Sequence, residues 1–178
     1  MRKRIELLTL IILIVSTFAV AQKDKSQRPS PPAQAQCSFS DGKTITVDYS
    51  SPRMKGRKIF GDLVPYGEVW RTGANEATTF VTTGDLKVEG HAIPAGNYTI
   101  FTVPEADKWT LIINKTTGEW GIPYKYESAE LARVGMTVSR TSSPVENFAI
   151  AFEQGGKSCT MNVSWENTEA SVKFMEGK

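Results

Sequence analysis

The sequence predicts an all-β protein: a single antiparallel β-sandwich, jelly-roll-like or immunoglobulin-like, with little helix outside an N-terminal leader. Three observations lead to this prediction. Apolar residues recur with a period of two over short runs, glycines and prolines separate these runs, and no long helical pattern follows the leader.

The alternation is strictest at 44–49, where every second residue is apolar. Two later runs flank Gly155 and Gly156, which is a signal for a β-hairpin. Residues 128–133 also suit the start of a short helical turn. The predicted strands cover 44–49, 77–83, 86–88, 97–103, 109–114, 131–138, 148–154, 158–165 and 170–174.

The leader has the features of a secretory signal peptide. Basic residues at positions 2–4 precede a nearly continuous apolar run at 7–20, and Ala19 and Ala21 are small residues of the kind that signal peptidase reads. The apolar run is shorter than the roughly 20 residues that a membrane-spanning helix needs. We therefore predict cleavage after residue 21, no transmembrane segment in the mature chain, and a periplasmic or secreted protein.

The net charge excludes some classes of partner. The whole chain has 21 Lys and Arg against 19 Asp and Glu. The predicted signal peptide contains three of the basic residues and one of the acidic ones, so the mature chain has no net charge. Nothing in this balance supports binding to nucleic acid or to an anionic membrane surface. The sequence also carries no sign of an oligomeric state.

The mature chain divides into two parts. Residues 22–36 are rich in proline and glutamine and lack any aromatic or large aliphatic residue, which predicts a disordered spacer. Residues 37–178 have a globular composition and a common size for one domain with its own core.

Cys37 and Cys159 are the two cysteines of the chain, and they lie near opposite ends of the predicted domain. In an exported protein a pair of cysteines is typically joined in a disulfide. The alternative is two buried free thiols. The disulfide reading places the first and last strands of the domain side by side.

Most kinds of catalytic or cofactor site are not supported. His91 is the single histidine, which argues against a catalytic triad and against histidine-rich zinc or copper sites. The chain has no phosphate-binding loop motif, no paired-cysteine motif and no spaced acidic calcium loop. The sequence therefore predicts no cofactor and no metal.

Two clusters suit a binding site. The run 70–76 (WRTGANE) joins a tryptophan to an arginine fork, an amide and a carboxylate, and 119–126 (EWGIPYKY) is rich in aromatic residues. The cations at 55–58 add positive charge. Each residue also has a structural reading, as an ion-pair partner within a loop or as an aromatic cover over the sheet. The predicted ligand-binding residues are Arg57, Trp70, Arg71, Asn75, Glu76, Trp120 and Tyr124.

At these residues the chain resembles a bacterial exported family known as domain of unknown function 2911. The matching runs are 51–61 (SPRMKGRKIFG), 70–78 (WRTGANEAT), 93–101 (IPAGNYTIF), 109–114 (WTLIIN), Trp120-Gly121 and Trp165-Glu166. The resemblance implies an exported, mostly β domain. It implies no established activity and no catalytic residue.

Three functions follow from these observations. The leading hypothesis is a non-catalytic binding module of the cell envelope for a small polar or glycan-like ligand. The first alternative is a glycoside hydrolase that uses Glu76 or Glu119 as acid or base, since that chemistry needs paired carboxylates. The second alternative is a structural or protein-interaction domain whose tryptophans serve packing.

Overall fold

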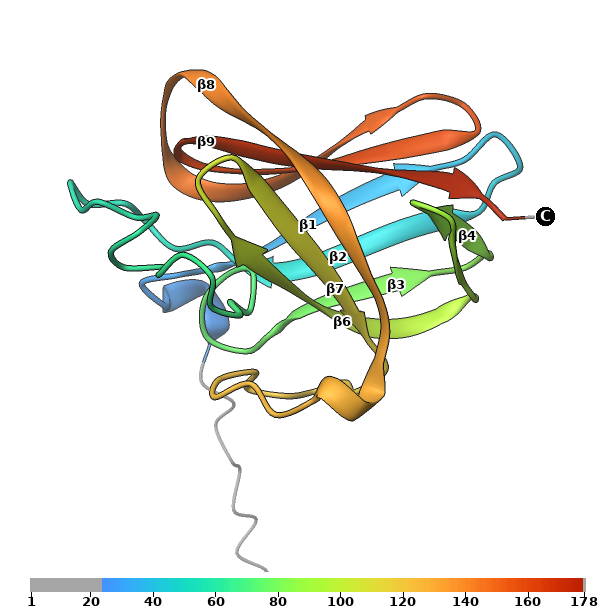
Figure 1. The fold of residues 1–178 in the computed structure, drawn as a ribbon, viewed down its shortest axis with the longest axis horizontal. Helices are drawn as coiled ribbons and strands as arrows, with labels where there is room; N and C mark the ends of the chain where they lie inside the picture. The colour runs from blue at the N-terminus through green and yellow to red at the C-terminus, as the bar shows by residue number, and fades with distance from the viewer. Residues whose placement is uncertain (1–23, 178) are drawn as a thin grey trace, which may run out of the picture.

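Nine β-strands hydrogen-bond side by side in one antiparallel sheet within residues 24–177, which are the residues that the computed structural model describes (Figure 1). Their order across the sheet is β1-β2-β3-β6-β7-β8-β9-β4-β5. The strands are β1 (Pro32–Ser38), β2 (Thr44–Ser50), β3 (Thr78–Thr82), β4 (Leu86–Val88), β5 (His91–Ile93), β6 (Gly96–Pro104), β7 (Lys108–Asn114), β8 (Glu130–Gln154) and β9 (Ser158–Glu176). Helix in these residues is limited to two 3-10 turns, η1 (Lys25–Gln27) and η2 (Glu127–Ala129), which confirms the all-β prediction.

The N-terminal boundary of the domain differs from the prediction. Residues 32–36, which we expected in a disordered spacer, form the first part of β1, and Ala35 is buried. β1 pairs with β2 along its whole length, so backbone hydrogen bonds order a segment that lacks large side chains. Pro32 is tolerated because it is the first residue of an edge strand. The predicted signal peptide 1–21 lies outside the described residues.

The sheet curls until its first strands meet its long last hairpin. The Met54 amide donates to the Glu146 carbonyl at 2.8 Å, and the Phe148 amide donates to the Pro52 carbonyl at 2.9 Å. These bonds join the segment after β2 to the middle of β8. In Figure 1 the orange and red hairpin of β8 and β9 lies beside the blue β1, in agreement with contacts between β1 and β8. The single sheet thus closes into a sandwich-like fold.

The central strands β6 and β7 are buried on both faces. Ile100 of β6 lies in the main core inside the curled sheet, whereas its neighbour Phe101 lies in a second, small cluster with Ile112 of β7. Tyr124 and Tyr126, from the loop between β7 and β8, cover this second cluster. Burial on both faces makes these two strands a fixed support for the loops around them.

The predicted disulfide between Cys37 of β1 and Cys159 of β9 is present. Both cysteines are buried, and the Ser40 amide donates to the Gly156 carbonyl at 3.0 Å close by. The first and last strands of the domain therefore lie side by side, as the disulfide reading of the sequence required.

Replacing Cys37 and Cys159 together with alanine removes a cross-link across a sequence separation of 122 residues. We expect the free energy of unfolding to fall by about 4–5 kcal/mol, because the unfolded chain gains conformational entropy. Urea unfolding followed by tryptophan fluorescence measures the change, and chemically reduced wild-type protein is the matched control. Unchanged midpoints in both samples would contradict this prediction.

Candidate functional site

The run 70–76 forms a tight loop that is hydrogen-bonded to the edge of β6. Trp70 and Thr102 exchange two backbone hydrogen bonds of 2.8 and 2.9 Å. The Thr72 side chain is buried, and its hydroxyl lies 3.1 Å from the hydroxyl of Thr102. Gly73 has a φ of +153°, and an added Cβ there would lie 3.0 Å from the Ser50 carbonyl oxygen. The loop is therefore held by its own backbone and by buried hydroxyl groups.

Trp70 belongs to a cluster of aromatic rings at the closure of the sheet. Its ring stacks on that of Trp165, with centroids 6.0 Å apart and planes 17° apart, and it meets Phe148 edge-on at 5.1 Å. Trp109 and Phe60 complete the cluster. The Trp70 indole N–H donates to the Gly73 carbonyl at 3.1 Å. The ring thus presents only its apolar surface to any ligand.

Arg71 is held in place by backbone carbonyls and by an indole ring. Its Nη1 donates to the Asn75 carbonyl at 2.6 Å and to the Trp120 carbonyl at 3.2 Å, and its Cζ lies 5.0 Å from the centre of the Trp120 ring. Within residues 24–177 the guanidinium makes no ion pair, and its Nε and Nη2 make no hydrogen bond. Burial lowers the pKa of Arg71, while the charge of Glu76 acts to raise it.

Arg57 is also oriented by carbonyl groups. Its Nε donates to the Met54 carbonyl at 3.0 Å and its Nη2 donates to the Arg53 carbonyl at 2.6 Å. Arg57 is exposed, and none of the ion pairs in the described part of the chain involves it. It can therefore offer its Nη1 donors and its charge to an incoming group.

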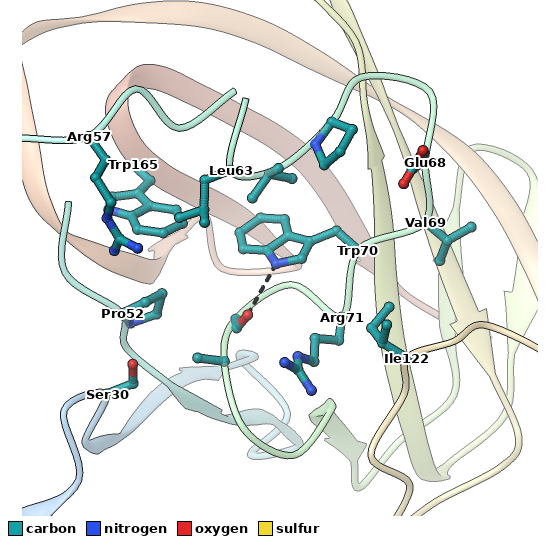
Figure 2. Close-up of a pocket in the computed structure, with 14 residues that line it drawn as sticks. Ser30, Pro52, Arg57, Leu63, Glu68, Val69, Trp70, Arg71, Ile122 and Trp165 are labelled. Carbon is teal, nitrogen blue, oxygen red and sulfur yellow. Dashed lines mark hydrogen bonds between the residues drawn. The ribbon is translucent and has the colours of Figure 1, made fainter. Parts of the chain in front are cut away.

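A cavity of about 400 Å³ lies between these residues. Figure 2 shows Trp70 and Trp165 in its wall, with Arg57 beside Trp165 and Arg71 on the other side of Trp70. Ser30, from the segment before β1, also contributes to the lining. The apolar part of the lining comes from Pro52, Leu63, Val64, Pro65, Val69 and Ile122.

Asn75 and Glu76 point to the N-terminal segment and do not line this cavity. The Asn75 amide donates to the Ser30 carbonyl at 3.0 Å. Arg28 donates twice to the Glu76 carboxylate, at 2.7 and 3.0 Å, and Lys25 lies 3.3 Å from the same group. The hydrogen bonds from Arg28, with the charge of Lys25, lower the pKa of Glu76 to about 2. These two motif residues fasten the segment that carries Ser30.

Tyr124 and Trp120 lie near the cavity without lining it. The Tyr124 hydroxyl donates to Glu130 and accepts a hydrogen bond from the amide of Asn114 at 3.3 Å. Burial and the bond to Glu130 raise the pKa of Tyr124. Its ring packs edge-on against Phe101. Trp120 is 56% exposed and serves as the surface on which Arg71 lies.

Of the predicted site residues, the cavity therefore brings together Arg57, Trp70 and Arg71. Sequence reasoning did not find its apolar walls, because they come from three distant loops whose aliphatic residues give no periodic signal. It also did not assign a role to Trp165, although this residue lies in one of the runs quoted above. Among residues 24–177, no group of three or more His, Cys, Asp or Glu could hold a metal ion.

The fold and the cavity together define a class of protein, an all-β domain with an aromatic cavity edged by two arginines. The chain belongs to the family described as "Protein of unknown function (DUF2911)", whose model matches residues 30–174. No curated protein and no solved structure shows a significant match to the chain. Of the helices in the described part, none is long and apolar enough to cross a membrane.

Glu76→Gln should weaken the attachment of the N-terminal segment at neutral pH. A carboxyl group whose pKa falls from 4.5 to about 2 on folding adds stability above pH 4.5, and this stability disappears as the pH falls towards 2. We expect a loss of about 1 kcal/mol at pH 7, because the Glu76 side chain is 42% exposed and its ion pairs are screened. The difference between variant and wild type should shrink near pH 2. Urea unfolding at pH 7 and pH 2.5 tests this, with exposed Glu127→Gln as the control; equal effects of the two variants at pH 7 would contradict it.

Trp70→Ala and Trp120→Ala should differ in their effect on stability, because Trp70 packs in the aromatic cluster and Trp120 lies at the surface. Trp70 contacts the aromatic cluster, so its removal should lower the free energy of unfolding by about 3 kcal/mol. Trp120 is 56% exposed and loses mainly its contact with Arg71, for which about 1 kcal/mol or less is expected. Chemical unfolding of the two variants side by side measures this. A larger effect at Trp120 than at Trp70 would contradict the assignment.

Proposed function

We propose that this protein is an exported binding module that holds a small polar, negatively charged ligand, a class that includes acidic glycans. The observation that carries the proposal is the state of Arg71 beside the cavity. Its guanidinium is oriented by two carbonyls and one indole ring, yet no carboxylate of residues 24–177 pairs with it. A partly buried cation without a partner favours an anionic ligand.

The aromatic wall supports the same function. Binding sites for small molecules are typically concave, mostly apolar, and supplied with a few polar groups that fix the orientation of the ligand. The cavity fits that description, with Trp70 and Trp165 as rings and Arg57 and Arg71 as charged groups. Its volume of about 400 Å³ lies in the range of such sites.

The geometry gives less support to the glycosidase alternative. That chemistry places two carboxyl groups on either side of the scissile bond. Neither Glu76 nor Glu119 lines the cavity; Glu68 is the one carboxylate among the described residues that do. Glu76 is committed to Arg28 and Lys25, and its low pKa disfavours the protonated form that a general acid needs.

Export is part of the proposal. It rests on the predicted signal peptide 1–21, which would deliver the mature chain to the periplasm or the medium. A buried disulfide between Cys37 and Cys159 is compatible with an oxidising compartment outside the cytoplasm.

Thermal unfolding of the mature chain, residues 22–178, tests the proposed function. The panel contains acidic and neutral envelope glycans, peptidoglycan fragments and small carboxylates and phosphates. A ligand at 100 times its Kd stabilises the folded state by about 2.7 kcal/mol, which gives a readable rise in Tm. We expect acidic compounds to raise the Tm of the wild type and of the control Arg140→Ala, and not that of Arg71→Ala.

Arg140 is a suitable control because it is an arginine of β8 that does not line this cavity. If no acidic compound raises the Tm, or if Arg71→Ala responds as the wild type does, the proposed function is wrong. That result would favour the alternative of a structural or protein-interaction domain, which a pull-down from envelope extract would then test.

A further inference from the structure

We infer that the ligand of this cavity is an amphiphilic carboxylate: one carboxylate group joined to an aliphatic body, rather than a sugar acid. This inference rests on the proposed function and narrows it. It depends on three features of the cavity, namely the free edge of Arg71, the composition of the walls, and the exposed apolar side chains at the mouth.

The first feature is the part of the Arg71 guanidinium that remains available. Both carbonyl contacts use Nη1, whereas Nε and Nη2 make no hydrogen bond within residues 24–177. These two nitrogens form one edge of the planar group and can donate two parallel hydrogen bonds to the two oxygens of a carboxylate. Because Nη1 and the Trp120 ring already fix the guanidinium plane, little side-chain entropy is lost on binding.

The second feature is the chemistry of the walls, in which the polar side chains of Ser30, Glu68 and the two arginines lie among apolar and aromatic residues. The side chains of Trp70 and Trp165 offer no free donor, because their indole N–H groups already donate to the Gly73 and Glu146 carbonyls. A sugar ring carries several hydroxyl groups, and burying them without hydrogen bonds is unfavourable. An aliphatic body has no such requirement and gains from contact with Val69 and the rings.

The third feature is the mouth of the cavity. Leu63 is 45% exposed and Ile122 is 41% exposed, although both are large apolar residues, and both line the cavity. Figure 2 shows them on two sides of Trp70, with Arg71 close to Ile122. An alkyl chain that extends from a carboxylate bound at Arg71 and lies across Trp70 can cover both Leu63 and Ile122, which removes apolar surface from water.

The remaining charges favour a single negative group on the ligand. Arg57 has already committed its Nε and Nη2 to carbonyls, so it attracts an anion mainly through its charge and Nη1. Glu68 lies on the opposite side of the cavity from Arg57 in Figure 2 and would repel a second carboxylate. A monoanion with an uncharged body therefore fits this set of charges.

Isothermal titration calorimetry on the mature chain tests the inference with acetate, hexanoate, octanoate and decanoate, each below its micelle concentration. Octanol and glucuronate serve as comparisons: the first lacks the charge and the second lacks the aliphatic body. We expect affinity to rise about fourfold for each methylene added between hexanoate and decanoate, because each one buries apolar surface. Octanol and glucuronate should bind at least tenfold more weakly than octanoate.

Three variants and a control identify the site. Arg71→Gln should weaken the binding of octanoate at least tenfold. Arg71→Lys should recover only part of this lost affinity, because lysine keeps the charge without the planar edge of the guanidinium. Leu63→Ser should reduce the gain in affinity per added methylene, while the affinity for acetate stays unchanged. This variant changes an exposed side chain, so it remains informative if the arginine variants fold poorly. Arg140→Gln should match the wild type.

The outcomes separate the inference from the proposed function. If glucuronate or another sugar acid binds in an Arg71-dependent way and the alkyl series shows no rise with length, the inference is overturned and the proposed function stands. If none of the anions binds, both are overturned. A rise with chain length that is unchanged in Arg71→Gln and in Leu63→Ser places the alkyl chain elsewhere and also overturns the inference.

Discussion

The candidate site exists because the sheet closes on itself. The two backbone bonds between the segment after β2 and the middle of β8 bring Pro52 and Trp165 to one place, although they are far apart in the sequence. The stacked rings of Trp70 and Trp165 then fill the space where the ends of the sheet meet. Without this closure, the loops that carry Arg57 and Arg71 would have no common wall to line.

The same closure explains why most of the WRTGANEAT run has structural tasks. Trp70 fills the closure, Thr72 is buried against Thr102, and Asn75 and Glu76 fasten the segment before β1. Arg71 lines the cavity, and its Nε and Nη2 make no hydrogen bond within the described part of the chain. A motif that looks like a ligand-binding set in the sequence thus consists mainly of residues that build the loop, while Trp70, Arg71, Gly73 and Ala74 line the cavity.

How much the sequence could predict depends on how local the cause of each feature is. The strand at 44–49 follows from alternation within a few residues, the strand at 109–114 from a run of aromatic and aliphatic residues after a turn, and the hairpin from Gly155-Gly156; all of them are present. The sequence does not predict β1, because this strand is ordered by pairing with β2 and a run of alanines and glutamines carries no signal for that pairing. The predicted runs 131–138 and 148–154 proved to be one strand, β8, whose pairing with β9 is interrupted near Val145.

The site was harder to predict than the fold because its walls come from distant loops. Tyr124 was grouped with the ligand-binding residues on the strength of its aromatic neighbours, but it covers Phe101 and bonds to Glu130. Leu63 and Ile122 gave no signal, because an isolated aliphatic residue in a loop reads the same in sequence whether it lines a cavity or not. Whether such a residue lines the cavity depends on where the closed sheet positions its loop.

The charge of Arg71 connects the architecture to the function. A partly buried guanidinium is usually neutralised by a carboxylate, because desolvation of an unpaired charge is unfavourable. Here two carbonyl dipoles and the face of Trp120 orient the group but add no negative charge, and burial lowers its pKa. Glu76, the acidic residue of the motif, is paired with Arg28 and Lys25, although its charge still acts on the pKa of Arg71. The carboxylate of the motif is therefore paired with the N-terminal segment and forms no ion pair with Arg71 within the described residues, which is why the proposed function gives Arg71 an anionic ligand.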